Sequence, residues 1–108
     1  QKAVRELGKV LANNPDIAVL IEGHTDNVPY GGSGPLKDNW DLSTKRATEV
    51  LKLLLDNSSI NPQNLTAAGK GEFAPLAPNT TAEGKAKNRR IEVVMTPNLD
   101  QLFEIINE

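Results

Sequence analysis

The stretch Ile17-Ala18-Val19-Leu20-Ile21-Glu22-Gly23-His24-Thr25-Asp26 decides how this chain can fold. Its first five residues are apolar without alternation, and a short run of this kind is typical of a central strand covered on both faces. Three polar side chains, those of His24, Thr25 and Asp26, then follow together. Because α/β sheets place their ligand sites at the carboxyl ends of strands, this stretch predicts a strand that opens directly into a functional site.

The same polar residues also have a purely structural interpretation. Thr25 and Asp26 can end a strand by binding nearby backbone amides. The next residues, 27–39 (NVPYGGSGPLKDN), form a loop rich in Gly and Pro, and a loop of this length in a small domain is more often functional than not. The sequence alone leaves both interpretations of the polar residues open.

Amphipathic patterns predict the elements on either side of this strand. Apolar residues at helical spacing predict a helix over the first fourteen residues, which Asn13-Asn14-Pro15 ends. A second helix is expected over Leu42–Asp56, with Asp41 or Ser43 as its N-cap. The further expected elements are a strand over Leu65–Gly69, a short helix from the capping box Thr80-Thr81-Ala82-Glu83 through about Lys87, a strand over Arg90–Thr96 and a last helix after Pro97. The order α-β-α-β-α-β-α predicts an α+β sandwich with helices packed on a mixed sheet.

The composition limits the chain to one ordinary globular domain. Of its 108 residues, 38% are hydrophobic and 24% are charged, which excludes a disordered tail. The longest apolar run, Ile17–Ile21, is far shorter than the ~20 residues that span a bilayer. The net charge of -2 disfavours a duplex-binding protein, so no nucleic-acid partner is expected. With no cysteine in the chain, disulfide scaffolds, zinc fingers and thiol catalysis are excluded, and neither a metal nor another cofactor is expected.

Asp26 and Arg46 carry opposite charges that suit a zwitterionic ligand. With Ser43 as N-cap, Arg46 would lie in the first helical turn, where the helix dipole disfavours a cation by a few tenths to ~1 kcal/mol unless an anion lies nearby. Arg46 therefore either pairs internally with Asp26 or Asp41, or holds a carboxylate ligand bidentately. In the second case Asp26 would bind an ammonium group, and the pair would fit the headgroup of a free amino acid.

Catalysis has little support in the sequence. His24 is the only histidine, and no second His, Cys or pair of carboxylates converges with it on a hydrolytic or metal site. The basic run from Lys85 to Arg90 is interpreted as a solvated surface and the start of a strand. A nucleic-acid patch is the less favoured interpretation of this run, because no aromatic residue is interleaved with it.

Four blocks of the sequence together resemble the OmpA-like/MotB-like peptidoglycan-binding domain. In chain order they are Ile21–Asn27 (IEGHTDN), Asn39–Ala47 (NWDLSTKRA), Gly69–Glu72 (GKGE) and Asn88–Glu92 (NRRIE). The resemblance covers residues 1–96 and implies a βαβαβ-type sandwich whose first strand would precede Gln1. We therefore expect the domain to span residues 1–97, with a helical extension over residues 98–108.

The resemblance implies a non-catalytic anchor that binds peptidoglycan on the periplasmic side of the outer membrane in Gram-negative envelopes. Its ligand would be the diaminopimelate end of the peptidoglycan stem peptide, which is a zwitterion. The aspartate and arginine of the family's motifs match Asp26 and Arg46. Asn39 and Arg89 match positions that line the same pocket, and Thr25 would contribute mainly its backbone.

The sequence is compatible with more than one parent protein and with one alternative function. The domain would belong to an outer-membrane protein or lipoprotein, or to the periplasmic part of a flagellar stator, whose MotB-like branch the residues Val28-Pro29-Tyr30 and Asn39-Trp40 resemble more closely. Membrane contact would come only through other parts of that parent, and a homodimer is left open. A cell-wall hydrolase centred on His24 is the alternative of a different class.

Overall fold

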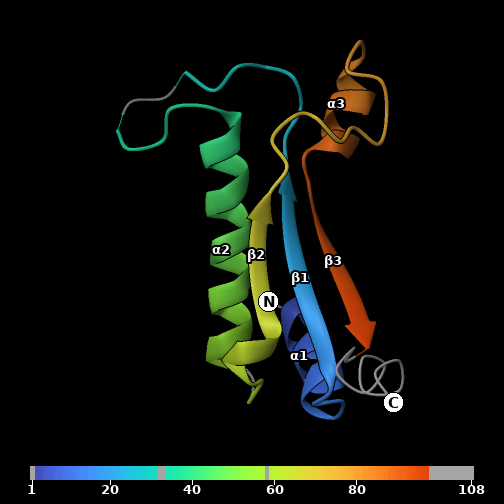
Figure 1. The fold of residues 1–108 in the computed structure, drawn as a ribbon. Coiled ribbons are helices and arrows are strands. Elements are labelled where there is room, and N and C mark those ends of the chain that lie inside the picture. Colours follow the sequence, from blue (N-terminus) through green and yellow to red (C-terminus); the bar gives the residue numbers. More distant parts are fainter. Residues whose placement is uncertain (1, 32–33, 58, 98–108) are drawn as a thin grey trace, which may run out of the picture.

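A computed structural model describes residues 2–31, 34–57 and 59–97 and has a three-stranded sheet at its centre (Figure 1). The elements are α1 (Lys2–Ala12), β1 (Ile17–His24), α2 (Asn39–Asn57), a 3-10 turn (Pro62–Asn64), β2 (Leu65–Gly69), α3 (Ala82–Asn88) and β3 (Arg90–Pro97). The strand order is β2-β1-β3, with β1 parallel to β2 and antiparallel to β3. Helices packed on a mixed sheet confirm the α+β sandwich predicted from the sequence. Among the described helices, none combines the length and apolarity needed to cross a membrane.

Helices α1 and α2 pack together on one face of the sheet. The core joins Leu11 of α1 and Leu54 of α2 to Val19 and Ile21 of β1, and all four side chains are buried. Burying apolar area of this kind contributes about 25 cal/mol per Å² to folding. The core therefore lies between this face of the sheet and the two long helices.

The expected cover on both faces of β1 is wrong for the described part of the chain. Burial alternates along the strand, so that Ala18 is exposed and Leu20 half-buried while Val19 and Ile21 are buried. The central position of β1 between β2 and β3 is as expected. The unbroken apolar run at the start of β1 nevertheless occurs in a strand that buries only one of its two faces. Single apolar side chains are common on protein surfaces. Because Ala18 and Leu20 are apolar although they face away from the core, the sequence does not show the alternation of apolar and polar residues that is typical of a sheet with one buried face.

Helix α2 begins earlier than the sequence predicts, because Asp38 is its N-cap. The Asp38 carboxylate accepts a hydrogen bond from the Asp41 amide at 2.9 Å, and the Asp38 carbonyl accepts one from the Leu42 amide at 3.1 Å. The assignment of the cap to Asp41 or Ser43 is therefore wrong. Arg46 consequently lies beyond the first turn of α2, where the helix dipole is weak, so the dipole is no argument for an anion beside it.

Ser43 has a different role, since it holds α2 against the end of the sheet. A Cβ atom on Gly23 of β1 would lie only 2.0 Å from the Ser43 carbonyl oxygen, so the helix and strand approach each other through the missing side chain. The buried Ser43 hydroxyl donates to the Trp40 carbonyl at 3.0 Å and accepts from the Gly71 amide at 3.0 Å. Ser43, which the sequence offered as a possible cap, thus makes a tertiary contact between α2 and the end of the sheet.

The remaining elements agree with the sequence patterns to within a few residues. Helix α3 begins one residue later than the expected box, because the Thr81 hydroxyl caps it by accepting from the Gly84 amide at 2.9 Å. Strand β2 has the predicted bounds, and β3 includes the predicted Arg90–Thr96. The helix expected after Pro97, with the extension over residues 98–108, lies outside the described residues.

We expect Gly23→Ala to destabilise the domain by ~2 kcal/mol or more, because its Cβ would overlap a backbone carbonyl that cannot move without shifting α2. Urea denaturation followed by circular dichroism measures the change. The matched control is Gly31→Ala, whose Cβ would meet nothing within 4 Å and whose cost should stay within about 0.5 kcal/mol. Equal stability of the two variants would contradict the close contact.

Candidate functional site

A hollow of about 340 Å³ lies where β1 runs into the 27–38 loop, at the end of the sheet that is uppermost in Figure 1. Three separate segments line it, namely the end of β1 with its loop, the first turns of α2, and the residue that follows α3. The lining residues are Thr25, Asp26, Val28, Pro29, Tyr30, Asn39, Leu42, Arg46 and Arg89. All five residues singled out from the sequence as ligand-binding therefore come together around one hollow.

Asp26 is a buried carboxylate with two partners. Its Oδ2 atom lies 2.6 Å from Nη1 of Arg89, and its Oδ1 atom accepts a hydrogen bond from the Val28 amide at 3.0 Å. Burial raises the pKa of Asp26, but the hydrogen bonds from Arg89 and Val28 and the positive charges of Arg89 and Lys85 outweigh it. The pKa therefore lies below the ordinary value of 3.8, and Asp26 is ionised at neutral pH.

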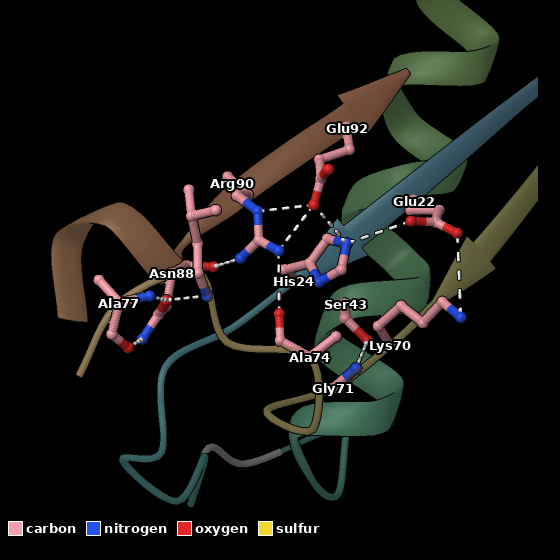
Figure 2. A network of polar contacts seen from close by, with 11 residues as sticks. Glu22, His24, Ser43, Lys70, Gly71, Ala74, Ala77, Asn88, Arg90 and Glu92 are labelled. Carbon is pink, nitrogen blue, oxygen red and sulfur yellow. Dashed lines mark hydrogen bonds and ion pairs between the residues drawn. The ribbon is translucent and has the colours of Figure 1, made fainter. Parts of the chain in front are cut away.

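Arg89 reaches Asp26 because Asn88 fixes the end of α3. The Asn88 side chain is fully buried, and its oxygen accepts from the amides of Leu76 and Ala77 at 2.7 and 2.9 Å. Its amide group donates to the Ala77 carbonyl at 2.9 Å (Figure 2). It also donates to the Asn79 side-chain oxygen at 2.7 Å. Asn88 thus ties the 71–79 loop to α3 and leaves Arg89 facing the end of β1. Composition and spacing do not reveal this role, since the partners of Asn88 are backbone groups of a loop.

Asn39 and Thr25 hold the backbone around Asp26. The Asn39 amide group donates to the carbonyls of Val28 and Asp26 at 3.1 and 3.4 Å. The Thr25 hydroxyl donates to the Asp26 carbonyl at 2.8 Å, and the Thr25 backbone amide donates to the Gly71 carbonyl at 2.9 Å. Of the two residues, only Asp26 binds a nearby backbone amide through its side chain, as the structural interpretation expects, and it also faces a hollow and a cation. The Thr25 hydroxyl binds a local carbonyl instead.

Arg46 lines the hollow with an exposed guanidinium group. It forms no hydrogen bond or ion pair with any residue that the structure describes. The internal pairs considered from the sequence are not made, because Asp26 binds Arg89 and the Asp41 carboxylate accepts from the Lys37 amide at 2.8 Å. The hollow therefore contains one ionised carboxylate and one cation that makes no hydrogen bond or ion pair with a described residue, although Glu49, one turn along α2, attracts its charge.

The apolar part of the hollow was missed by sequence reasoning. Val28, Pro29 and Tyr30 form one side of it, and Leu42 lies at the start of α2. A usable signal was present, because three apolar residues in a row are unusual within a loop that is otherwise rich in Gly and polar residues. These residues add a surface for hydrocarbon groups beside the two charges.

His24 belongs to a separate polar cluster on β1 and β3, which Figure 2 shows. Its Nε2 atom lies 3.4 Å from Oε1 of Glu22 and 3.2 Å from Oε2 of Glu92. Arg90 binds Glu92 at 2.6 Å, and the Lys70 ammonium lies 3.9 Å from Glu22. His24 is not among the residues that line the hollow.

The same cluster has the residue types of a cation site. The ligand atoms of Glu22, His24 and Glu92 lie within 4.8 Å of one another, so the expectation that no pair of carboxylates converges with His24 is wrong. The sequence did not reveal the pair because Glu92 comes from β3, 68 positions after His24. Both carboxylates, however, already have a cationic partner, in Arg90 and Lys70. An added divalent ion would have to compete with these two charges, which disfavours a metal at this position.

Comparison with known protein families identifies the class of this domain. Residues 1–89 match the model of the OmpA family, and the chain belongs to this family. Motility protein B of Bacillus subtilis (strain 168) is 42% identical to it over 93 residues, which are 86% of this chain and 35% of that protein. Outer membrane porin F of Pseudomonas aeruginosa is 36% identical over 89 residues, which are 82% of this chain and 24% of the porin. The chain thus spans only about a third or less of the length of these relatives.

Solved structures agree with this assignment. The C-terminal domain of Helicobacter pylori MotB superimposes with a TM-score of 0.82 at 26% identity, covering 98% of this chain and 80% of that one. The cell wall anchor of the T6SS from Pseudomonas aeruginosa superimposes with a TM-score of 0.77 at 34% identity, covering 91% of this chain and 66% of that one. The fold implied by the sequence resemblance is therefore confirmed.

The lowered pKa of Asp26 predicts a particular pH dependence of stability. Since the folded pKa lies below 3.8, the ionised pair with Arg89 stabilises the fold above that pH, and this contribution is lost as the pH falls through the folded pKa. We expect the stability difference between the wild type and Asp26→Asn to be constant above about pH 5 and to shrink below about pH 4. Urea denaturation at a series of pH values measures it. A difference that persists unchanged in strong acid would contradict the pair, and Arg89→Gln should reduce the wild-type pH dependence in the same range.

Proposed function

We propose that this domain binds peptidoglycan non-covalently, through the diaminopimelate end of the stem peptide. One observation carries the proposal, namely that the ionised Asp26 and the unpaired Arg46 line the same hollow of about 340 Å³. A free amino acid end offers an ammonium group for Asp26 and a carboxylate for Arg46. Both contacts would be charge-assisted hydrogen bonds, which are about twice as strong as neutral ones.

The Arg89 pair prepares Asp26 for this ligand and does not consume it. A carboxylate has about four acceptor sites, of which Arg89 and the Val28 amide occupy two. The remaining sites can accept an ammonium group, while Arg89 keeps the carboxylate charged and oriented. Asn39 and Thr25 act as positioning residues, because their hydrogen bonds go to the backbone beside Asp26.

The apolar side of the hollow suits the rest of the same ligand. The hydrocarbon chain of diaminopimelate would pack on Val28, Pro29 and Leu42, which line the hollow beside the charges. Its charged end would have to reach Asp26 and Arg46 together. A ligand with only one of the two charges would leave Asp26 or Arg46 without its contact, so the arrangement selects for a zwitterion.

Substitution of the two charged residues tests this proposal. We expect Asp26→Ala and Arg46→Ala each to lower the affinity for isolated peptidoglycan sacculi by about tenfold or more, because each removes one charge-assisted contact. Co-sedimentation with sacculi measures binding, and circular dichroism checks that the variants are folded. Lys52→Ala is the matched control, since it removes an exposed cation from the same helix outside the hollow. Binding that survives both substitutions unchanged would rule the proposal out.

We further propose that the domain is an anchor and not an enzyme. The matched relatives are named as a motility protein, a porin and a cell wall anchor. His24, around which a hydrolase would be built, lies in the cluster whose carboxylates are paired with Arg90 and Lys70. The pure domain should therefore release no soluble muropeptides from sacculi in an overnight incubation, as measured by chromatography. Release that His24→Ala abolishes would establish the hydrolase instead.

The relatives also suggest where the domain is located and which kinds of protein could contain it. We place the domain at the cell wall, on the periplasmic side of the envelope, as part of a membrane-attached protein. An outer-membrane protein or lipoprotein is one parent that fits, as the similarity to porin F supports. A flagellar stator subunit is the second, and the 42% identity to motility protein B supports it. The complete sequence of the parent protein would distinguish them, because a stator subunit would contain a transmembrane helix and an outer-membrane protein a barrel or a lipobox.

A further inference from the structure

Beside the hollow, Trp40 and Phe73 form an exposed aromatic platform. Their ring centroids lie 5.1 Å apart with an angle of 27° between the planes. Trp40 is 49% exposed and Phe73 is 64% exposed. Trp40 lies in the first turn of α2 and Phe73 in the segment after β2, so two parts of the chain that are distant in sequence present one apolar surface. Exposed apolar surfaces of this kind mark interaction sites.

The platform borders a second hollow, of about 220 Å³, that adjoins the first. The two hollows share Pro29, Tyr30 and Asn39 in their linings. A ligand that extends out of the first hollow over these residues would therefore arrive at the two rings.

The lining of the second hollow also contains three charged residues, Lys37, Asp38 and Glu72. The side chains of Lys37 and Glu72 form no hydrogen bond or ion pair with any residue the structure describes, and one oxygen of Asp38 caps α2. Donors and acceptors thus surround an apolar face. Sugars have the complementary arrangement, because a pyranose ring carries C–H groups on its faces and hydroxyl groups around its edge.

The platform is fixed to the same backbone that supports Asp26. Trp40 lies over Gly71, where a Cβ atom would come within 3.3 Å of its ring and where the φ angle is +60°. The Gly71 amide donates to Ser43 at 3.0 Å, and its carbonyl accepts from Thr25 at 2.9 Å. The rings are therefore connected through Gly71 to the backbone that leads into the first hollow.

We propose that this platform binds one pyranose ring of the glycan strand while the adjoining hollow holds the stem peptide. The inference rests on the proposed function and extends it to the second component of peptidoglycan. A C–H face of the sugar packs on the exposed side of the stacked Trp40–Phe73 pair, and its edge forms hydrogen bonds with Lys37, Asp38 and Glu72. Because the stem peptide is covalently attached to the glycan, occupation of both hollows by one ligand costs less entropy than binding two separate molecules.

The single tryptophan of the chain allows a direct test, since its emission reports on the platform alone. Two probes are compared, a disaccharide-tripeptide and the tripeptide without sugar. We expect the disaccharide-tripeptide to shift Trp40 emission and to bind about three- to tenfold more tightly than the tripeptide, which should leave the emission unchanged. Phe73→Ala should lower the affinity for the disaccharide-tripeptide to that of the tripeptide and leave the tripeptide affinity unchanged.

Met95→Ala is the matched control. Met95 is 48% exposed, close to the 49% of Trp40, but it lies on β3 and outside the lining of both hollows. It should affect neither probe. If the sugar adds no affinity, or if Phe73→Ala weakens both probes equally, the platform does not bind glycan. If Phe73→Ala instead changes the molecular mass in light scattering, a second copy covers the rings and the inference is wrong.

The same two probes distinguish a failure of the proposed stem-peptide binding from a failure of the proposed glycan binding. If the tripeptide does not bind to the wild type, the stem-peptide assignment is wrong. The platform inference then stands only if the sugar-containing probe still shifts Trp40 emission and Phe73→Ala abolishes that shift, and it falls otherwise.

Discussion

The close contact between α2 and the end of β1 is the constraint on which the rest of the site depends. Gly23 has no side chain, so the Ser43 carbonyl can lie where a Cβ atom would otherwise be. In this position the Ser43 hydroxyl accepts from the Gly71 amide, and the Gly71 carbonyl in turn accepts from the Thr25 amide. Helix α2, the segment after β2 and the end of β1 are thereby joined through backbone groups. Asp26 follows Thr25 directly, so the position of its carboxylate derives from this junction.

The charges of the site matter through their placement and not through their sum. Arg89 is 46% exposed in its side chain, so water and salt screen its pair with Asp26 and limit what the pair adds to stability. The main effect of Arg89 is on the protonation state of Asp26, whose carboxylate stays ionised although it is buried. Arg46 supplies the second charge without a protein partner among the described residues. A net charge of -2 is thus compatible with a site for a zwitterion, because the overall charge does not report on such a pair.

Local patterns predicted most of the fold, and contacts distant in sequence account for what they missed. Periodicity located the helices and strands, since each of these patterns depends on neighbours within one or two turns. It pointed to Asp41 or Ser43 as the cap of α2 and missed Asp38, although all three are good cap residues. The choice was made by the tertiary contact of Ser43 with Gly71.

In the candidate site, too, local patterns identified some residues and contacts between residues distant in sequence determined the others. Asp26 and Arg46 were found from their charge and position, whereas Arg89 came only from the family resemblance. The pair that Arg89 forms with Asp26 joins residues 63 positions apart, and no local pattern encodes such a distance. The stacking of Trp40 on Phe73 was missed for the same reason. Contacts of this range depend on how α2, β1 and α3 pack, which periodicity does not determine.

The openness of the site agrees with attachment to a polymer. Arg46 is exposed and Arg89 is partly exposed, so water competes for each charge and a single contact is modest in strength. A free amino acid would gain only these contacts. The cell wall offers many linked copies of one ligand, so that release from one copy is followed by rebinding at a neighbour at high effective concentration. If the domain binds peptidoglycan as proposed, an anchor built in this way would hold a large structure firmly while each individual site remained reversible.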